Sequence, residues 1–211
     1  MRIALIPVKD LSEAKARLAS VLDAAGRREL ALAMFRDVLA AARACSAFDG
    51  VAVVTRDEEA LAIAEAAGVE GLAEAGSLNE ALTSASEAVA QRGAERIVVL
   101  AADLPFVTAD EITVVAKGSA DVVVAAAKDG GTNALALAPG AIAFRFGRES
   151  AGKHIDAARK AKLQAVRIES PCLAFDVDTP EDLRALREAI DSGRRAGRHT
   201  DTLFRTASRT G

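Results

Sequence analysis

The sequence predicts a single α/β domain built around a mainly parallel sheet. Short apolar runs alternate along the chain with longer stretches in which apolar residues recur at helical spacing. Several of the short runs are almost wholly apolar, which is typical of strands buried on both faces of a sheet. Hydrophobic residues make up 51% of the 211 residues, which is enough for a large core. Strand and helix patterns that alternate in this way indicate an α/β protein.

Six apolar runs are interpreted as strands, and five amphipathic stretches as helices. The expected strands cover residues 3–8, 51–55, 96–101, 121–126, 133–137 and 165–168. The expected helices cover residues 24–44, 58–67, 78–91 and 108–117, and a last one begins at Thr179. Gly68 follows the second helix as a C-cap does. Thr108 and Glu111 have the spacing of a capping box, and Thr179 followed by Pro180 is a typical helix start.

The composition argues against several classes of protein. A net charge of −3 argues against a globally basic nucleic-acid binder. No apolar run approaches the roughly 18 residues that a membrane span needs, and the first run is too short for a signal peptide. Cys45 and Cys172 lack the spacing of metal ligands. We therefore expect two reduced thiols in a cytoplasmic protein.

Residues 192–211 differ in composition from the rest of the chain. They contain five arginines, one aspartate and few apolar side chains. We therefore divide the chain into one domain, residues 1–191, and a basic, flexible C-terminal tail, residues 192–211. Such a tail can contact nucleic acid or an acidic partner, but a solvated terminus is the simpler interpretation.

The loop after the first strand is rich in cations, namely Lys9, Lys15 and Arg17. Ligands of open α/β sheets bind at the carboxyl ends of strands, so this loop is well placed to hold a polyphosphate. It is neither a Walker A loop nor a dinucleotide fingerprint, because the required glycines are missing. The alternative is that these cations form the polar face of a short helix.

Three aspartates follow expected strands or precede the last helix. Asp103 comes between the apolar run 96–101 and Pro105, and Asp176 alternates with Asp178 just before the last helix. A Mg²⁺ ion prefers one or two carboxylates together with water and phosphate oxygens. Asp103 and Asp178 have an alternative use as caps, whereas Asp176 has none. We therefore predict that Asp103 and Asp176 together bind the metal ion, since Asp176 is a better candidate than Asp178.

Two further segments have side chains suited to a ligand. Asn79 lies near the start of the third helix, where its amide can pair with a base edge or ribose, although asparagine there is usually a cap. Residues 130–154 contain five glycines, small polar side chains and several cations, among them His154. This composition suits the capture of a small phosphorylated acid, and the alternative is a surface loop followed by a basic helix cap. No Ser-His-Asp or Cys-His arrangement is convincing, so catalysis would depend on positioning and charge neutralisation.

The order of these motifs resembles the 2-phospho-L-lactate guanylyltransferase family of deazaflavin coenzyme (F-420) biosynthesis. That family is itself similar to the molybdenum-cofactor nucleotidyltransferases of the glycosyltransferase-A type. The resemblance covers residues 5 to about 186. It is carried by Pro7-Val8-Lys9, Ala14 to Leu18, Leu78 to Leu82, Asp103-Leu104-Pro105, Gly130 to Leu135, Phe146 to Ser150 and Asp176 to Pro180. It implies a Rossmann-like, three-layer α/β/α fold of the nucleotide-diphospho-sugar transferase type.

The resemblance also implies an activity, the transfer of GMP from GTP to a small phosphorylated acid with release of pyrophosphate. The acids of the family are 2-phospho-L-lactate, phosphoenolpyruvate and 3-phospho-D-glycerate, and the sequence does not choose among them. By this resemblance Lys9, Lys15 and Arg17 would act on the GTP phosphates, and Asn79 would lie against the nucleoside. Asp103 and Asp176 would bind Mg²⁺, with Asp178 close by. Thr132, Gly147 and Ser150 would hold the acid.

Three points remain open at this level. Another phosphorylated acceptor, such as a sugar phosphate or a molybdopterin-like ligand, is the first alternative. A non-catalytic GTP-binding domain is the second. The third is the oligomeric state, because an apolar edge strand can support a homodimer.

Overall fold

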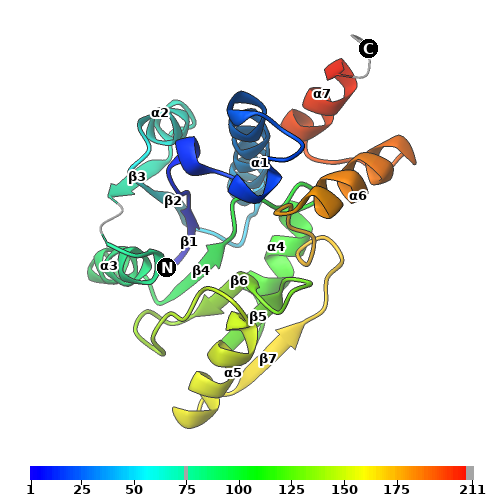
Figure 1. The fold of residues 1–211 in the computed structure, drawn as a ribbon. Coiled ribbons are helices and arrows are strands. Elements are labelled where there is room, and N and C mark those ends of the chain that lie inside the picture. Colours follow the sequence, from blue (N-terminus) through cyan, green and yellow to red (C-terminus); the bar gives the residue numbers. More distant parts are fainter. Residues whose placement is uncertain (74–75, 208–211) are drawn as a thin grey trace.

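A seven-stranded sheet forms the centre of the molecule (Figure 1). The computed structural model describes residues 1–73 and 76–207. The strands are β1 Arg2–Pro7, β2 Gly50–Thr55, β3 Glu70–Ala73, β4 Arg96–Leu100, β5 Val122–Ala126, β6 Thr132–Leu137 and β7 Ala165–Ile168. Their order across the sheet is β3-β2-β1-β4-β6-β5-β7. Strand β6 runs antiparallel to both of its neighbours and the other pairs are parallel, which confirms the mainly parallel sheet.

The predicted strands are all present, with bounds that agree to within one residue, and β3 is an addition. Strand β3 has the sequence Glu-Gly-Leu-Ala, which neither alternates nor forms an apolar run. It lies at the edge of the sheet and is mostly exposed, so packing does not demand a hydrophobic pattern there. The sequence therefore held no strand signal at this position.

Helices cover both faces of the sheet and give the expected three layers (Figure 1). They are α1 Ala24–Ala44, α2 Glu58–Ala66, α3 Leu78–Gln91, α4 Ala109–Ala116, α5 Ser150–Lys160, α6 Pro180–Asp191 and α7 Arg198–Ala207. Helices α1, α2 and α4 pack on one face, and α3 and α5 on the other. Five of them begin at a side-chain cap, at Asp23, Asp57, Ser77, Thr108 and Thr179.

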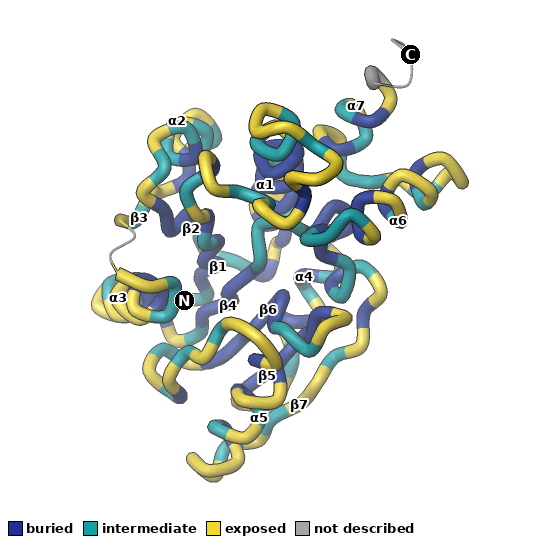
Figure 2. The backbone as a smooth tube through the Cα atoms, in the orientation of Figure 1, coloured by how far each residue is buried: buried dark blue, intermediate teal, exposed yellow. Residues whose placement is uncertain are grey.

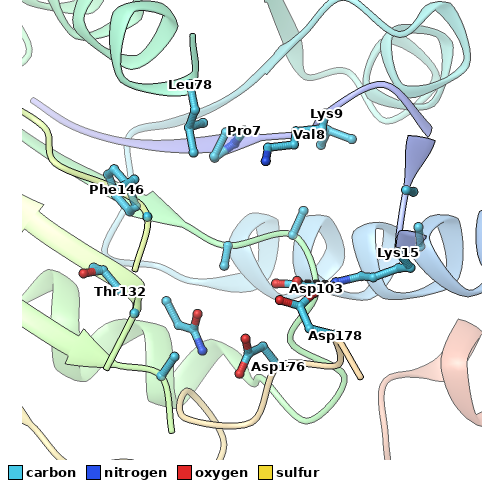
Figure 3. A pocket seen from close by; sticks show the side chains of 18 of the residues that line it. Pro7, Val8, Lys9, Lys15, Leu78, Asp103, Thr132, Phe146, Asp176 and Asp178 are labelled. Atoms are coloured by element: carbon cyan, nitrogen blue, oxygen red, sulfur yellow. Dashed lines mark hydrogen bonds and ion pairs between the residues drawn. The ribbon is translucent and has the colours of Figure 1, made fainter. Parts of the chain in front are cut away.

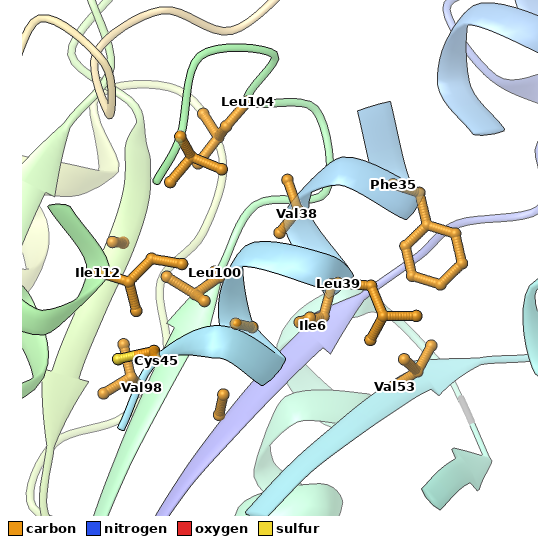
Figure 4. Close-up of a cluster of buried hydrophobic side chains, with 14 of the residues drawn as sticks. Ile6, Phe35, Val38, Leu39, Cys45, Val53, Val98, Leu100, Leu104 and Ile112 are labelled. Atoms are coloured by element: carbon orange, nitrogen blue, oxygen red, sulfur yellow. The ribbon is translucent and has the colours of Figure 1, made fainter. Parts of the chain in front are cut away.

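The core consists of two layers separated by the sheet, because successive strand residues point to opposite faces. Ala4 and Ile6 of β1 contribute to the layer under α1, whereas Ile3 and Leu5 contribute to the layer under α3. Figure 4 shows the first layer, with side chains of α1 lying over the strands. The central strands are buried along most of their length (Figure 2). A third cluster lies on the outer side of α1 and joins it to α6 and α7.

The C-terminal segment differs from the mobile tail that we expected, because residues 198–207 form helix α7 on the outer side of α1 (Figure 1). The buried Asp37 carboxylate of α1 accepts the backbone N–H groups of His199 and Thr200, each at 2.8 Å. Phe204 packs into the third cluster. A carboxylate at the positive end of a helix stabilises that helix, and arginine content alone cannot reveal this contact. The domain division at residue 191 stays a prediction, and residues 208–211 lie outside the described ranges.

Substituting Gly197 tests the packing of α7. A methyl group at Gly197 would overlap the Asp37 side chain, so we expect Gly197→Ala to lower the free energy of unfolding by about 1–3 kcal/mol. A methyl group at Gly152 of α5 would meet no neighbouring side chain within 4 Å, so Gly152→Ala is the matched control and should leave stability unchanged or slightly raised. Urea unfolding followed by circular dichroism measures both. A Gly197→Ala protein as stable as the wild type would contradict this packing.

Two further observations bear on the sequence expectations. Among the described residues, no helix has the length and apolar character needed to cross a membrane. Cys45 and Cys172 are both free thiols, the first buried and the second partly buried.

Candidate active site

The carboxyl ends of β1, β2 and β4 and the first residues of β6 open onto one cavity of about 1090 Å³ (Figure 3). This arrangement is possible because β6 runs opposite to β4, so the start of β6 meets the end of β4. The predicted site residues that line the cavity are Lys9, Lys15, Arg17, Asp103, Thr132, Gly147, Ser150, Asp176 and Asp178. Of the predicted set, Asn79 is absent from this lining.

Asp103, Asp176 and Asp178 form a carboxylate cluster at one end of the cavity. Each offers an oxygen, and these oxygens lie within 4.8 Å of one another. Asp176 is only 8% exposed, and its Oδ1 accepts no hydrogen bond from another described residue. Burial, together with the Asp103 charge, raises the pKa of Asp176 to about 6. Hard oxygen ligands around an unsatisfied carboxylate fit a divalent cation such as Mg²⁺.

The side chain of Lys15 lines the cavity and is directed at this cluster (Figure 3). Its ammonium group contacts Asp103 Oδ2 and lies 2.9 Å from Asp178 Oδ1. Burial alone would lower the pKa of Lys15, but the two carboxylates outweigh it and hold that pKa above its usual value. Lys15 therefore stays charged and neutralises part of the cluster.

The backbone of the first loop is shaped to bring Lys15 there. Lys15 has a left-handed conformation, with φ 53°, between the single-turn helices η1 Leu11–Glu13 and η2 Ala16–Leu18. This conformation has a steric cost for lysine, and the contacts with two carboxylates offset it. Lys9 and Arg17 are exposed on the same loop and line the cavity mouth. The simple polar helix face that we considered is thus not what the loop forms.

A second ion pair supports the aspartates from behind. Asp182 Oδ2 accepts the backbone N–H groups of Asp178 and Thr179, each at 2.9 Å. Lys128 contacts Asp182 Oδ1, and its Nζ lies 3.4 Å from the Asp176 carbonyl oxygen. Sequence reasoning missed both supporting residues. Asp182 was visible as the third residue of the last helix, but nothing in the sequence connects it with Lys128, which lies 54 positions away.

At the other end of the cavity, Thr132 and Ser150 form a buried hydroxyl pair. Ser150 Oγ lies 2.9 Å from Thr132 Oγ1, at the start of α5 and of β6 respectively. Gly147 lies in the loop between these elements with φ 129°, a conformation that favours glycine. The two ends of the cavity are therefore chemically different. The first has three carboxylates that could hold a cation, and the second has a buried hydroxyl pair, with Arg148 and Glu149 also in the lining.

His154 does not act as a cation here, so our expectation that its charge would neutralise an anion is wrong. Its ring is fully buried. Burial, and next the charge of Arg145, lowers the pKa of His154 to about 4, so the ring is neutral at physiological pH. The Arg145 backbone N–H donates to its Nε2 at 3.0 Å, and its Nδ1 lies 3.1 Å from Thr132 Oγ1.

Asn79 binds the loop before Gly147. Its Oδ1 accepts the Phe146 N–H at 2.8 Å, and its Nδ2 donates to the Phe146 carbonyl oxygen at 3.3 Å. The cap of α3 is Ser77, which forms a capping box with Glu80, so the alternative of Asn79 as a cap is wrong. Contact of Asn79 with a nucleoside stays a prediction.

Arg56 also lines the cavity, and the sequence analysis did not select it. It directly follows β2 and is exposed. The rule that led to Lys9 and Asp103, a polar residue just after a strand, would have found it. Arg56 adds a cation to the side of the cavity that the first loop forms.

Residues 1–194 match the family described as "Guanylyl transferase CofC like". The chain belongs to this family. It is 43% identical over 188 residues to a phosphoenolpyruvate guanylyltransferase of Chloroflexus aggregans, which covers 85% of this chain and 93% of the relative. It is 38% identical over 184 residues to a 2-phospho-L-lactate guanylyltransferase of Methanothermobacter thermautotrophicus, which covers 85% of this chain and 81% of the relative.

Solved structures support the same fold. A Desulfovibrio desulfuricans G20 protein named as a nucleotide-diphospho-sugar transferase superposes with a TM-score of 0.78 at 19% identity, over 98% of this chain and 95% of that one. A nucleotidyl transferase from Methanothermobacter superposes with a TM-score of 0.64 at 16% identity. The superposition covers 91% of this chain and 98% of that one. The expected nucleotide-diphospho-sugar transferase fold is confirmed, and with the family match the protein is a nucleotidyltransferase.

In this guanylyltransferase family member, Asp182 is expected to support the carboxylate cluster without binding a ligand. Asp182→Ala removes the acceptor of two backbone N–H groups and the partner of Lys128, so we expect about 1–3 kcal/mol less unfolding free energy and weaker binding of divalent cations. The exposed neighbour Glu181 provides the control Glu181→Ala, which should change stability by less than about 0.5 kcal/mol. Chemical unfolding and Mn²⁺ calorimetry measure these effects; equal behaviour of the two variants would oppose this role.

Proposed function

We propose that the protein is a Mg²⁺-dependent guanylyltransferase of coenzyme F-420 biosynthesis. It would transfer GMP from GTP to a phosphorylated three-carbon acid, namely 2-phospho-L-lactate, phosphoenolpyruvate or 3-phospho-D-glycerate. One observation carries this proposal: a single cavity joins the carboxylate cluster with Lys15 to the hydroxyl pair of Thr132 and Ser150. Such a cavity offers one end to a metal-bound triphosphate and the other to a small anion.

The acceptor needs little chemical activation. A phosphate monoester is mostly dianionic at neutral pH, since its second pKa is about 6, and is already a nucleophile. Its oxygen attacks the α-phosphorus of GTP in line, and the bond to the β-phosphate oxygen breaks to release pyrophosphate. No general base is required, which agrees with a cavity whose described lining residues include no histidine.

The main obstacle is the repulsion between two anions. Lys9, Arg17 and Arg56 lie on the first-loop side of the cavity, where they would neutralise the triphosphate. Asp103 and Asp176 would hold Mg²⁺, with Asp178 beside them, and the ion would supply charge neutralisation at the reacting phosphate. Positioning two bound reactants in line can lower a barrier by about 7–11 kcal/mol.

Pyrophosphate release is the direct test. Purified protein is incubated with GTP, MgCl₂ and each of the three acids, and mass spectrometry identifies the GDP-linked product. Phosphoenolpyruvate is the first candidate, because the relative with 43% identity carries that name. If no pyrophosphate is released with any of the three acids, this proposal is refuted. Turnover of sugar phosphates instead would favour another acceptor, and GTP binding without turnover would favour a non-catalytic domain.

The expected homodimer and cytoplasmic location stay predictions. Light scattering of the purified protein tests the first, and cell fractionation tests the second.

A further inference from the structure

We propose that His154 is a positioning residue that turns a hydroxyl proton of the Thr132 and Ser150 pair toward the acceptor. This inference rests on the proposed function and deepens it. His154 touches no open part of the cavity, so it would act through Thr132 and not on a substrate directly.

The tautomer of His154 follows from its neighbours. The Arg145 backbone N–H can only donate, and it points at Nε2 from 3.0 Å, so Nε2 carries the lone pair. In the neutral ring the proton must then lie on Nδ1. Nδ1 is 3.1 Å from Thr132 Oγ1, so His154 donates and Thr132 accepts.

A count of protons gives the consequence. Thr132 and Ser150 together have two hydroxyl protons, and the 2.9 Å bond between them uses one. Thr132 cannot donate its proton to His154, because His154 is already the donor there. Within the pair Ser150 Oγ donates to Thr132 Oγ1, so the O–H of Thr132 is left over. Thr132 lines the cavity, so that donor can be offered to an anionic oxygen of the acceptor.

The opposite tautomer would reverse this polarity. With a proton on Nε2 and a lone pair on Nδ1, Thr132 would donate to the ring and Ser150 to Thr132. No hydroxyl proton would then remain for a ligand, and the pair would present lone pairs to an anion. The backbone N–H of Arg145 fixes the tautomer of His154. It therefore determines that the hydroxyl pair presents a donor, and not lone pairs, to the acceptor.

The same ring also fixes the loop that closes this end of the cavity. Consecutive backbone N–H groups, of Arg145 and Phe146, are accepted by His154 Nε2 and Asn79 Oδ1. The Phe146 ring packs edge-on against His154, with centroids 5.0 Å apart. Gly147 follows directly, in its left-handed conformation. His154 thus ties together β6, the loop before Gly147 and α5.

Two conservative variants separate these contacts. An asparagine amide nitrogen lies near the position of Nδ1, so His154→Asn keeps a donor to Thr132 and loses the acceptor for Arg145. A glutamine amide oxygen reaches near Nε2, so His154→Gln keeps that acceptor and loses the donor. We expect His154→Gln to raise the KM for the acid about tenfold or more, His154→Asn to restore most of it, and the KM for GTP to stay within about twofold in both.

The kinetic result can overturn the inference in two ways. An acid KM that is unchanged in folded, active His154→Gln protein would overturn it. So would an equal rise of the KM for acid and for GTP, which would indicate general damage to the domain. Thermal melting of each variant confirms folding before the assay, and Thr132→Val, which lacks both hydroxyl functions, gives the upper limit of the expected effect.

A spectroscopic readout separates this inference from the proposed function. In ¹⁵N-labelled wild-type protein at pH 7, without substrates, His154 is expected to show the neutral Nδ1–H tautomer, and Thr132→Val should shift the Nδ1 resonance. An Nε2–H tautomer would refute the inference even if GMP transfer is observed. The Nδ1–H tautomer in a protein that fails to turn over all three acids would leave the geometry intact and refute only the proposed function.

Discussion

Replacing Asp176 with asparagine is expected to reduce GMP transfer by at least about 10³-fold and to stabilise the metal-free protein at pH 8. The first effect follows because the carboxylate cluster loses its most buried oxygen ligand, and a metal ion at a reacting phosphate contributes several kcal/mol. The second follows because the ionised Asp176 is buried beside Asp103, and its Oδ1 accepts no hydrogen bond from another described residue. Activity and stability should thus move in opposite directions.

The stability effect has a defined pH window. Folding raises the pKa of Asp176 from about 4 to about 6, so the folded state binds the proton more tightly than the unfolded state. The stability that the protonated group contributes is complete below about pH 4 and is lost as the pH rises through about 6. Melting temperatures in EDTA at pH 5 and pH 8 should therefore differ less in Asp176→Asn than in the wild type. Asp178→Asn is the control, because Asp178 pairs with Lys15 and its loss should bring no gain. An Asp176→Asn protein that melts below the wild type at pH 8 would contradict this account.

Replacing Lys15 with methionine is expected to lower turnover by about 10²- to 10³-fold while raising the affinity for divalent cations about tenfold or more. Turnover falls because a buried cation beside the reacting phosphates is lost. Metal affinity rises because the Lys15 ammonium contacts Asp103 and Asp178, two of the three clustered carboxylates, and competes with the ion for their oxygens. The metal-free variant should also be less stable, since three close carboxylates then lack a cation.

Mn²⁺ calorimetry and thermal melting with and without Mn²⁺ test this second prediction. The matched control is Lys9→Met, because Lys9 is exposed at the cavity mouth on the same loop. Lys9→Met should weaken GTP binding without changing Mn²⁺ affinity in the absence of nucleotide. If Lys15→Met binds Mn²⁺ more weakly than the wild type, the competition between lysine and metal does not exist.

The main features of the site were predictable because they depend on strand ends. An apolar run that stops at Asp103 or before Lys9 places that residue at the rim of a parallel sheet, whatever the rest of the fold. The alternation of Asp176 and Asp178 likewise places two carboxylates at one end of the cavity. These inferences need only the period of a strand and the direction of the chain, which local sequence encodes well.

The remaining features depend on contacts between distant segments. The pairing of Lys128 with Asp182, and of Asp37 with the start of α7, joins residues whose sequence spacing carries no information about their contact. The neutral state of His154 depends on its burial, which no local pattern shows. The amide side chain of Asn79 has the donor and acceptor groups that a ligand contact needs, yet both polar atoms bind the Phe146 backbone. Residue type predicted a hydrogen-bonding side chain, but it could not predict this backbone partner.

Because β6 runs opposite to β4, two differently built regions meet at one cavity. One side of the cavity is built from the ends of β1, β2 and β4, whereas a continuous segment, residues 127–160 with β6 and α5, supplies Thr132, Gly147 and Ser150. Under the proposed function, substitutions within this segment are expected to alter the choice of acid while the side expected to bind the triphosphate keeps its shape. A chimera that receives this segment from a relative with a different acid should therefore inherit that relative's preference together with the original demand for GTP.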